Sequence, residues 1–200
     1  MSDGATIDHK KVLQQTMKYV IHTKHRGLSI KPNLIFKDRH AQFIIRGRTD
    51  SNYATNPEGR KSISGLEVTL NGAPVVMRSV GQKIVALSVT EAELIACTQG
   101  AQEMLHIMRL LESMGLKVKK PMVLECDNKG ALDICNSWTI NGRTKHMDTR
   151  YYFLRELKEN GLMIFRWISG DDNSADLFTK NLPNPAFSKH VGHFCTDEEF

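Results

Sequence analysis

The sequence lacks long apolar runs, a cysteine pattern typical of metal sites, and any internal repeat. Its longest apolar stretches, such as 43–45 and 84–87, fall far below the roughly 20 residues that a membrane-spanning helix needs. The first eleven residues carry charge without an apolar stretch behind it, so we expect no secretory signal. These absences exclude a membrane protein or a repeat solenoid and favour a soluble globular chain.

Cysteine is scarce and unpatterned. The 200 residues hold four cysteines without a CxxC pair, namely Cys97, Cys126, Cys135 and Cys195. The first three fall inside segments of regular hydrophobic pattern. We therefore expect reduced core thiols and an intracellular compartment.

Charge is unevenly placed along the chain. Residues 1–48 hold ten Lys and Arg against three Asp and Glu, a net charge of +7, whereas the remaining residues hold 17 against 19, a net charge of −2. A basic segment beside a near-neutral body suits contact with a phosphate backbone. A solvated, lysine-rich helix face has the same charge, so both interpretations stay open.

Hydrophobic periodicity predicts an N-terminal helix followed by strands. Residues 8–24 form a basic amphipathic pattern with Val12, Met17, Val20 and Ile21 on one stripe, which we expect to pack against the remaining domain. Strands are expected at 42–49, 64–70 and 74–79. The last two flank Asn71-Gly72, a strong hairpin signal.

The second half alternates helices with strands. A long helix over 90–115 carries an apolar stripe that we expect in the core, made of Leu94, Cys97, Ala101, Met104, Met108 and Leu111. Its start fits a capping box of Thr90 with Glu93, or alternatively of Ser88 with Glu91. Further strands are expected at 122–126 and 162–168, and further helices at 131–136, 144–160, 176–181 and 183–194. This order predicts an α/β fold, a mixed sheet with helices on its faces.

Four carboxylates lie where these elements begin or end. Asp50 follows the first strand, Glu93 lies in the first turn of the long helix, Asp127 follows strand 122–126, and Asp176 begins a helix. Four converging carboxylates would repel one another unless cations neutralise them. Hard oxygen ligands select Mg²⁺ or Mn²⁺, and a pair of such ions is a recurring device for phosphodiester cleavage. The alternative is four unrelated surface acids at helix ends.

Five segments carry distinctive motifs: 49–65 (TDSNYATNPEGRKSISG), 85–96 (VALSVTEAELIA), 124–132 (LECDNKGAL), 142–156 (GRTKHMDTRYYFLRE) and 171–183 (DDNSADLFTKNLP). In this order they resemble the motifs of the ribonuclease H domain of copia-type LTR retrotransposon Pol polyproteins. The N-terminal helix through 27–28 is similar to the tail of the reverse transcriptase that precedes this domain. The resemblance thus spans nearly the whole chain.

The resemblance implies a ribonuclease H-like fold, with a five-stranded mixed sheet whose first three strands are antiparallel, flanked by helices and preceded by an N-terminal helix. It implies that Asp50, Glu93, Asp127 and Asp176 are the catalytic and metal-binding carboxylates, holding two Mg²⁺ ions with Mn²⁺ as a substitute. Glu91 competes with Glu93 for the second position. Glu93 is preferred because Glu-Leu-Ile-Ala matches the family pattern, which leaves Glu91 a structural role at the helix start.

Several positions depart from the family pattern. Asn52 and Tyr53 replace Asp-Trp, Leu94 replaces Tyr, and residues 77–80 (MRSV) replace Trp-Ser-Ser-Lys. None of these changes removes a candidate carboxylate. The loop 169–173 carries acids and lacks the Gly-His found before the last carboxylate in many cellular ribonucleases H.

Substrate contacts are expected from polar and basic residues beside the carboxylates. Ser88, Thr90, Asn128 and Lys129 are placed to reach RNA 2′-hydroxyls and phosphates. Arg143, Lys145 and Arg150 are candidates for holding the DNA strand, although a solvated helix face explains them equally well. His146 is a further candidate, with a capping or hydrogen-bonding role as the alternative.

The resemblance implies an endonuclease that hydrolyses the RNA strand of RNA–DNA hybrids, leaving 3′-hydroxyl and 5′-phosphate ends during reverse transcription. The alternatives are a catalytically inactive nucleic-acid-binding or tether module of a reverse transcriptase, and another metal nuclease of the same fold. The expected partners are the hybrid and the reverse transcriptase of the same polyprotein, without a membrane. The expected location is cytoplasmic, in a virus-like particle or its equivalent, with the nucleus as the alternative. We expect residues 1–40 to end the reverse transcriptase region, 41–183 to form the ribonuclease H domain, and 184–200 to form a C-terminal helix and tail.

Overall fold

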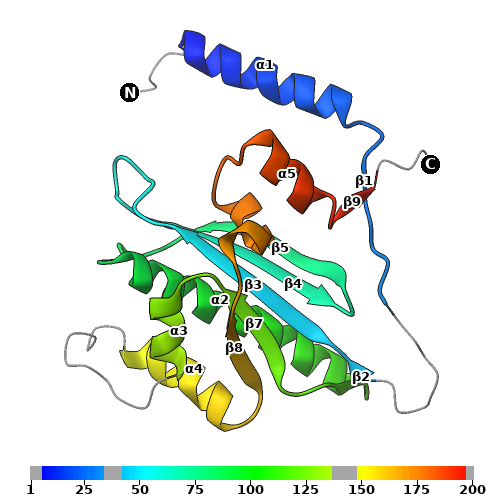
Figure 1. The fold of residues 1–200 in the computed structure, drawn as a ribbon, viewed down its shortest axis with the longest axis vertical. Helices are drawn as coiled ribbons and strands as arrows, with labels where there is room; N and C mark the ends of the chain where they lie inside the picture. The colour runs from blue at the N-terminus through cyan, green and yellow to red at the C-terminus, as the bar shows by residue number, and fades with distance from the viewer. Residues whose placement is uncertain (1–5, 34–41, 137–147, 197–200) are drawn as a thin grey trace.

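A five-stranded sheet organises the chain, with strand order β5-β4-β3-β7-β8 (Figure 1). The computed structural model describes residues 6–33, 42–136 and 148–196. The strands of the sheet are β3 (Ile45–Asn52), β4 (Ile63–Leu70), β5 (Ala73–Gly81), β7 (Met122–Cys126) and β8 (Met163–Trp167). β3, β4 and β5 pair antiparallel, and β7 and β8 run parallel to β3. This is the mixed sheet that the sequence predicted.

The hairpin between β4 and β5 turns at Asn71 and Gly72. Both residues have positive φ, 50° and 86°. Two consecutive positive φ angles are typical of the type I′ turn, whose twist matches that of the strands, and Asn-Gly adopts them at little cost. The predicted hairpin is confirmed.

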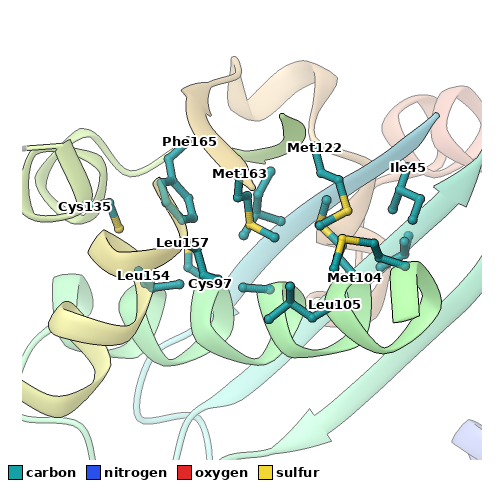
Figure 2. Close-up of a cluster of buried hydrophobic side chains, with 14 of the residues drawn as sticks. Ile45, Cys97, Met104, Leu105, Met122, Cys135, Leu154, Leu157, Met163 and Phe165 are labelled. Atoms are coloured by element: carbon teal, nitrogen blue, oxygen red, sulfur yellow. The ribbon is translucent and has the colours of Figure 1, made fainter. Parts of the chain in front are cut away.

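Three helices cover one face of the sheet (Figure 1). They are α2 (Val89–Ser113), α3 (Lys129–Asn136) and α4 (Asp148–Glu159). The predicted stripe of α2 is buried throughout and contacts β3, β4 and β7. Figure 2 shows side chains from α2, α4 and the sheet meeting in the core between these layers. Cys97, Cys126 and Cys135 are buried here as free thiols, as expected.

Shorter elements cover the opposite face. The 3-10 helix η3 (Ser174–Phe178) contacts β3 and β4, and α5 (Asn184–Val191) contacts η3. A second 3-10 helix, η2 (Gly170–Asp172), precedes η3. Two-residue strands complete the fold: β1 (Gly27–Leu28) pairs antiparallel with β9 (Cys195–Thr196), and β2 (Gln42–Phe43) pairs parallel with β6 (Lys117–Val118).

The N-terminal helix corrects one expectation. α1 (Ile7–His22) begins with a capping box, in which Thr6 Oγ1 accepts from His9 N–H at 3.3 Å. None of its residues is buried, and Val12 and Met17 are 64% and 56% exposed. Packing of this stripe against the sheet domain was therefore the wrong prediction. α5 and η3 already cover that face of the sheet, and α1 meets α5 through the edge-to-face rings of Tyr19 and Phe187, 5.9 Å apart.

The other predicted elements differ mainly at their ends. The helix expected over 144–160 corresponds to α4, which is described from Asp148 to Glu159; residues 144–147 lie outside the described residues. The helix expected over 183–194 corresponds to α5, which ends at Val191. The α-helix expected over 176–181 was wrong, because this stretch is covered by the short 3-10 helix η3 and an irregular segment. Among the described residues, no helix combines the length and apolar character required to cross a bilayer.

Candidate active site

Three of the four predicted carboxylates meet in the middle of the sheet, at the end where β7 finishes beside β3. Asp50 lies in β3 and is 1% exposed, and Asp127 follows β7. Thr49 pairs with Cys126 across these parallel strands, so the next residue on each strand lies at the same end of the sheet. Asp176 arrives from η3. Carboxylate oxygens of Asp50, Asp127 and Asp176 all lie within 4.8 Å of one another.

Glu93 joins this group from the start of α2. Its Oε1 accepts hydrogen bonds from the backbone N–H of Ser51 at 3.1 Å and from Ser51 Oγ at 2.9 Å. The thiol of Cys126 contacts its Oε2 at 3.6 Å. A ligand atom of Glu93 lies within 4.8 Å of one from Cys126 and one from Asp127. Asp127 therefore links Glu93 to the other two aspartates.

The start of α2 explains why Glu93 is free to face the site. Ser88 is the N-cap, with its Oγ accepting from Glu91 N–H at 3.1 Å. The Glu91 carboxylate accepts from Leu87 N–H at 2.7 Å. The start at Thr90 with Glu93 was thus the wrong alternative, and the helix starts at Ser88, with the Glu91 carboxylate bound to the N–H before the N-cap. Because Glu91 serves the helix end, Glu93 points its carboxylate at Ser51.

Burial and crowding raise the proton affinity of these acids. Burial, followed by the charges of Asp50 and Asp127, raises the pKa of Glu93 to about 8, although the hydrogen bonds from Ser51 oppose the shift. Burial raises the pKa of Asp50 as well, against the hydrogen bond from Thr179 and the charge of Lys180. Burial and the charge of Asp50 raise the pKa of Asp127. The cluster therefore holds its negative charge at an energetic cost that a cation would relieve.

A protein cation already lies in this cluster. Lys180 Nζ is 3.2 Å from Asp50 and 3.1 Å from Asp176 Oδ1. Thr179, the residue before it, donates from Oγ1 to Asp50 Oδ2. Neither residue was predicted from the sequence, although Lys180 lies four positions after Asp176, the spacing at which side chains on one helical face meet.

A row of alternating charges positions the segment that carries Asp176. Glu67, Arg48, Glu125 and Arg166 are direct neighbours across β4, β3, β7 and β8. Arg48 lies 3.8 Å from Glu67 and 3.3 Å from Glu125, and Arg166 lies 3.7 Å from Glu125.

Ser174 of η3 binds this row from the face of the sheet that η3 covers. Its Oγ accepts from Arg48 Nη1 at 2.9 Å and donates to Glu67 Oε2. Asn173 adds a hydrogen bond from Nδ2 to the backbone oxygen of Thr49 at 3.0 Å. The side chain of Asn173 also caps η3, accepting from Ala175 N–H at 3.3 Å. Asn173 and Ser174, which precede Asp176, thus fix its segment to β3. The sequence pattern predicted neither contact.

The donor set fits a hard divalent cation. It consists of carboxylate oxygens, which Mg²⁺ and Mn²⁺ prefer, and the ammonium of Lys180 shows that a positive charge is accommodated among them. The nearby thiol of Cys126 is directed at Glu93 and its pKa is raised, first by its contact with Cys97 and then by burial, so it stays protonated and is a poor metal ligand.

Three predicted substrate-contacting residues, Thr90, Asn128 and Lys129, lie around the start of α3, next to Asp127. Asn128 directly follows Asp127, and its Oδ1 accepts from Ala131 N–H at 2.9 Å at the start of α3. Thr90 and Asn128 both approach Gly130. Lys129 places its ammonium 5.3 Å from the ring centre of Trp167, and the Trp167 indole donates to the Asp127 backbone oxygen at 3.1 Å. Ser88 is exposed at the α2 N-cap.

The remaining predicted contacts lie elsewhere or outside the described residues. Arg150 lines a depression of about 560 Å³ between α2 and α4, together with Lys83 and Gln99. Arg143, Lys145 and His146 lie outside the described residues, so their placement stays a prediction.

The chain is related in sequence to retrovirus-related Pol polyproteins from plant transposons. It is 38% identical over 144 residues, 72% of its length, to the polyprotein of transposon TNT 1-94 from Nicotiana tabacum. It is 29% identical over 190 residues, 94% of its length, to that of transposon RE2 from Arabidopsis thaliana. The chain spans only 11% and 13% of these two relatives. No protein-family model matches it.

Solved structures with a similar fold are ribonucleases H. The structure of LC11-RNase H1 in complex with an RNA/DNA hybrid matches 74% of this chain and 99% of its own, with a TM-score of 0.51 and 14% sequence identity. At this identity the likeness establishes the fold. The chain therefore has the ribonuclease H fold and is a homologue of transposon Pol polyproteins, consistent with the ribonuclease H domain of a copia-type Pol polyprotein.

Proposed function

We propose that the chain is a metal-dependent ribonuclease H, which hydrolyses the RNA strand of RNA–DNA hybrids during reverse transcription of a retrotransposon. The observation that carries the proposal is the convergence of Asp50, Asp127 and Asp176 within 4.8 Å, with Glu93 tied to the same strand end through Ser51. These residues come from a strand, a helix, a loop and a 3-10 helix that are far apart in sequence. Such convergence has no evident structural benefit, because the acids destabilise one another.

These four carboxylates would hold the divalent cations. Bound there, two such ions would polarise the scissile phosphate and activate a water molecule for attack. The products would carry 5′-phosphate and 3′-hydroxyl ends, because the bond from phosphorus to the 3′-oxygen breaks.

The protein's own contribution is to fix the carboxylates in advance. Ser51 orients Glu93, Thr179 orients Asp50, and the bonds of Arg48 and Asn173 hold the segment of Asp176. Preorganisation of this kind lowers the cost of reaching the reactive geometry.

The hybrid would lie along the polar residues beside this cluster. Ser88, Thr90 and Asn128 offer hydroxyl and amide groups suited to the 2′-hydroxyls that distinguish RNA from DNA. Lys129 offers a charge to a phosphate, and its stacking on Trp167 holds it beside Asp127. LC11-RNase H1 binds an RNA/DNA hybrid, which supports this class of substrate for a chain of the same fold. The reverse transcriptase of the same polyprotein is the partner that the relatives support.

A catalytically inactive tether is the second candidate. A tether has no use for a buried glutamate that accepts two hydrogen bonds beside three aspartates. The observed site therefore favours the enzyme.

The test is cleavage of a labelled 20-base-pair RNA–DNA hybrid, with single-stranded RNA and double-stranded RNA as matched substrates. We expect cleavage of the hybrid in Mg²⁺ or Mn²⁺ and none in EDTA. Asp127→Asn should abolish cleavage, whereas Asp133→Asn, which changes an exposed acid on α3, should not. In EDTA, Asp127→Asn should melt at the same temperature as the unmodified chain or higher, because one repulsive charge is gone.

Each result has a distinct meaning. Equal cleavage by the Asp127→Asn variant would assign the activity to a contaminant or another site. Unfolding of that variant would make the carboxylate structural. An inactive but folded chain that still binds the hybrid would support the tether.

A further inference from the structure

Lys180 occupies the position of a counter-ion in the acidic cluster. Its Nζ lies 3.2 Å from both carboxylate oxygens of Asp50 and 3.1 Å from Asp176 Oδ1. The Asp50 side chain is 2% exposed, and that of Asp176 is 14% exposed. One ammonium group thus lies between two aspartates that the surrounding protein shields from water, and it offsets part of their negative charge.

The contacts of Lys180 favour its charged form. Its Nζ lies within 3.2 Å of carboxylate oxygens of two aspartates. An ammonium at this distance attracts both carboxylates and reduces the repulsion between them.

Three aspartates have carboxylate oxygens within 4.8 Å of one another, and two of them, Asp50 and Asp176, are the partners of Lys180. A divalent cation at this cluster would need oxygen atoms that Lys180 now contacts, and it would repel the ammonium at short range. The lysine has a flexible four-carbon stem, and its side chain is 38% exposed, so it has a path to solvent.

We propose that Lys180 is a built-in counter-cation, which holds Asp50 and Asp176 together in the metal-free protein and is displaced when a divalent cation binds. This inference rests on the proposed function, because it concerns the same carboxylates. Lys180 acts as a positioning residue, and it sets the metal affinity by competing for the ligands.

The test compares Lys180→Met with Lys189→Met. Lys189 pairs with Asp172 at 2.7 Å on the surface, and both of these side chains are about half exposed or more. Both variants lose one positive charge from the same segment, so long-range charge effects are matched. Lys180→Arg serves as a third variant that keeps a cation at the position.

Two measurements are made on each chain. The first is thermal unfolding in EDTA, where Lys180→Met should melt below the unmodified chain and Lys189→Met close to it. The second is Mn²⁺ affinity by isothermal titration calorimetry. Removal of the competing ammonium should tighten binding about fivefold in Lys180→Met, which corresponds to about 1 kcal/mol. Lys189→Met should bind Mn²⁺ as the unmodified chain does, and Lys180→Arg should not tighten binding.

Unchanged or weaker Mn²⁺ binding by a folded Lys180→Met would overturn the inference and leave the metal site itself intact. Equal tightening in Lys189→Met would also overturn it, because the effect would then be one of net charge. If Lys180→Met fails to fold in EDTA, Lys180→Gln is measured instead, and the same affinity criterion applies. Absence of Mn²⁺ binding in every chain would refute the proposed function along with this inference.

Discussion

Arg48 donates a hydrogen bond of 2.9 Å to Ser174 Oγ, and this contact joins the centre of the sheet to the 3-10 helix that carries Asp176. Arg48 also offsets the negative charge of Glu67, whose pKa is raised by burial. One side chain therefore neutralises a buried acid and holds a candidate metal ligand in place.

Arg48→Met should destabilise the chain and slow cleavage. It leaves Glu67 buried without its counter-charge and Ser174 without a donor, at a cost of roughly 1–3 kcal/mol in the free energy of unfolding. Urea unfolding measures this cost, and kcat should fall more than KM rises. Arg78→Met removes an exposed ion pair with Glu103 and should cost less than about 1 kcal/mol. A stability loss in Arg48→Met no larger than in Arg78→Met would contradict this account.

Gly65→Ala should displace η3. A Cβ at Gly65 would lie 2.5 Å from the backbone oxygen of Ala175 and 2.7 Å from Thr179 Cγ2, so the segment carrying Asp176 would have to move. We expect a loss of about 1–3 kcal/mol and a marked drop in cleavage. Gly81→Ala is the control, because nothing lies within 4 Å of its added Cβ. Similar melting temperatures for the two variants would mean that η3 adapts freely.

The stability of the metal-free chain should fall as pH rises from about 4.5 to about 8. The pKa of Glu93 is raised from 4.5 to about 8 in the folded chain, so over this window the folded state binds a proton that the unfolded state has released. The stabilisation is complete below the unfolded pKa and is lost as pH rises through the folded one, with a slope of at most about 1.4 kcal/mol per pH unit from this group.

Urea unfolding in EDTA across this pH range measures the effect. Glu93→Gln should flatten the curve, and Glu58→Gln, which alters an exposed loop residue, should leave it unchanged. Saturating Mg²⁺ should also flatten it, because a bound cation favours the ionised carboxylate. A slope identical in Glu93→Gln and the unmodified chain would show that other groups cause it.

Deletion of residues 1–23 separates two roles for α1. No residue of this helix is buried, so the melting temperature should fall by only a few degrees. If its lysines follow the hybrid, the plot of log affinity against log salt should flatten by roughly 0.9 for each lost phosphate contact. The deletion keeps β1 and its pairing with β9. A large fall in melting temperature with an unchanged salt slope would assign α1 to packing alone.

The sequence was most informative where a pattern repeats locally. The stripe of α2, the strand 122–126 and the Asn71-Gly72 turn depend on near neighbours, and the structure confirms all three. The end of strand 122–126 also indicated where Asp127 would lie. The expectation that Asp50 follows a strand ending at residue 49 was wrong, because β3 pairs with β4 as far as Asn52 and Asp50 lies within it.

Contacts between distant segments were not predictable in the same way. Side chains of a strand alternate between the two faces of the sheet, so the sequence shows that Arg48 and Asp50 share a face of β3. It does not show that residues 173–180 cover that face. Lys180 was missed because a lysine side chain is normally solvated, on a helix as in a loop. The exposed stripe of α1 was misread because amphipathic periodicity shows that a helix has an apolar face and does not show what covers it.

The alternating row of Glu67, Arg48, Glu125 and Arg166 also has a consequence for folding. A shift of β7 by one residue along β3 would turn Glu125 to the α2 face of the sheet and bury its charge among the apolar side chains there. A shift of β4 would do the same to Glu67. Misregistered sheets are therefore less stable than the native one. Only the native pairing of Thr49 with Cys126 leaves Asp50 and Asp127 as neighbours.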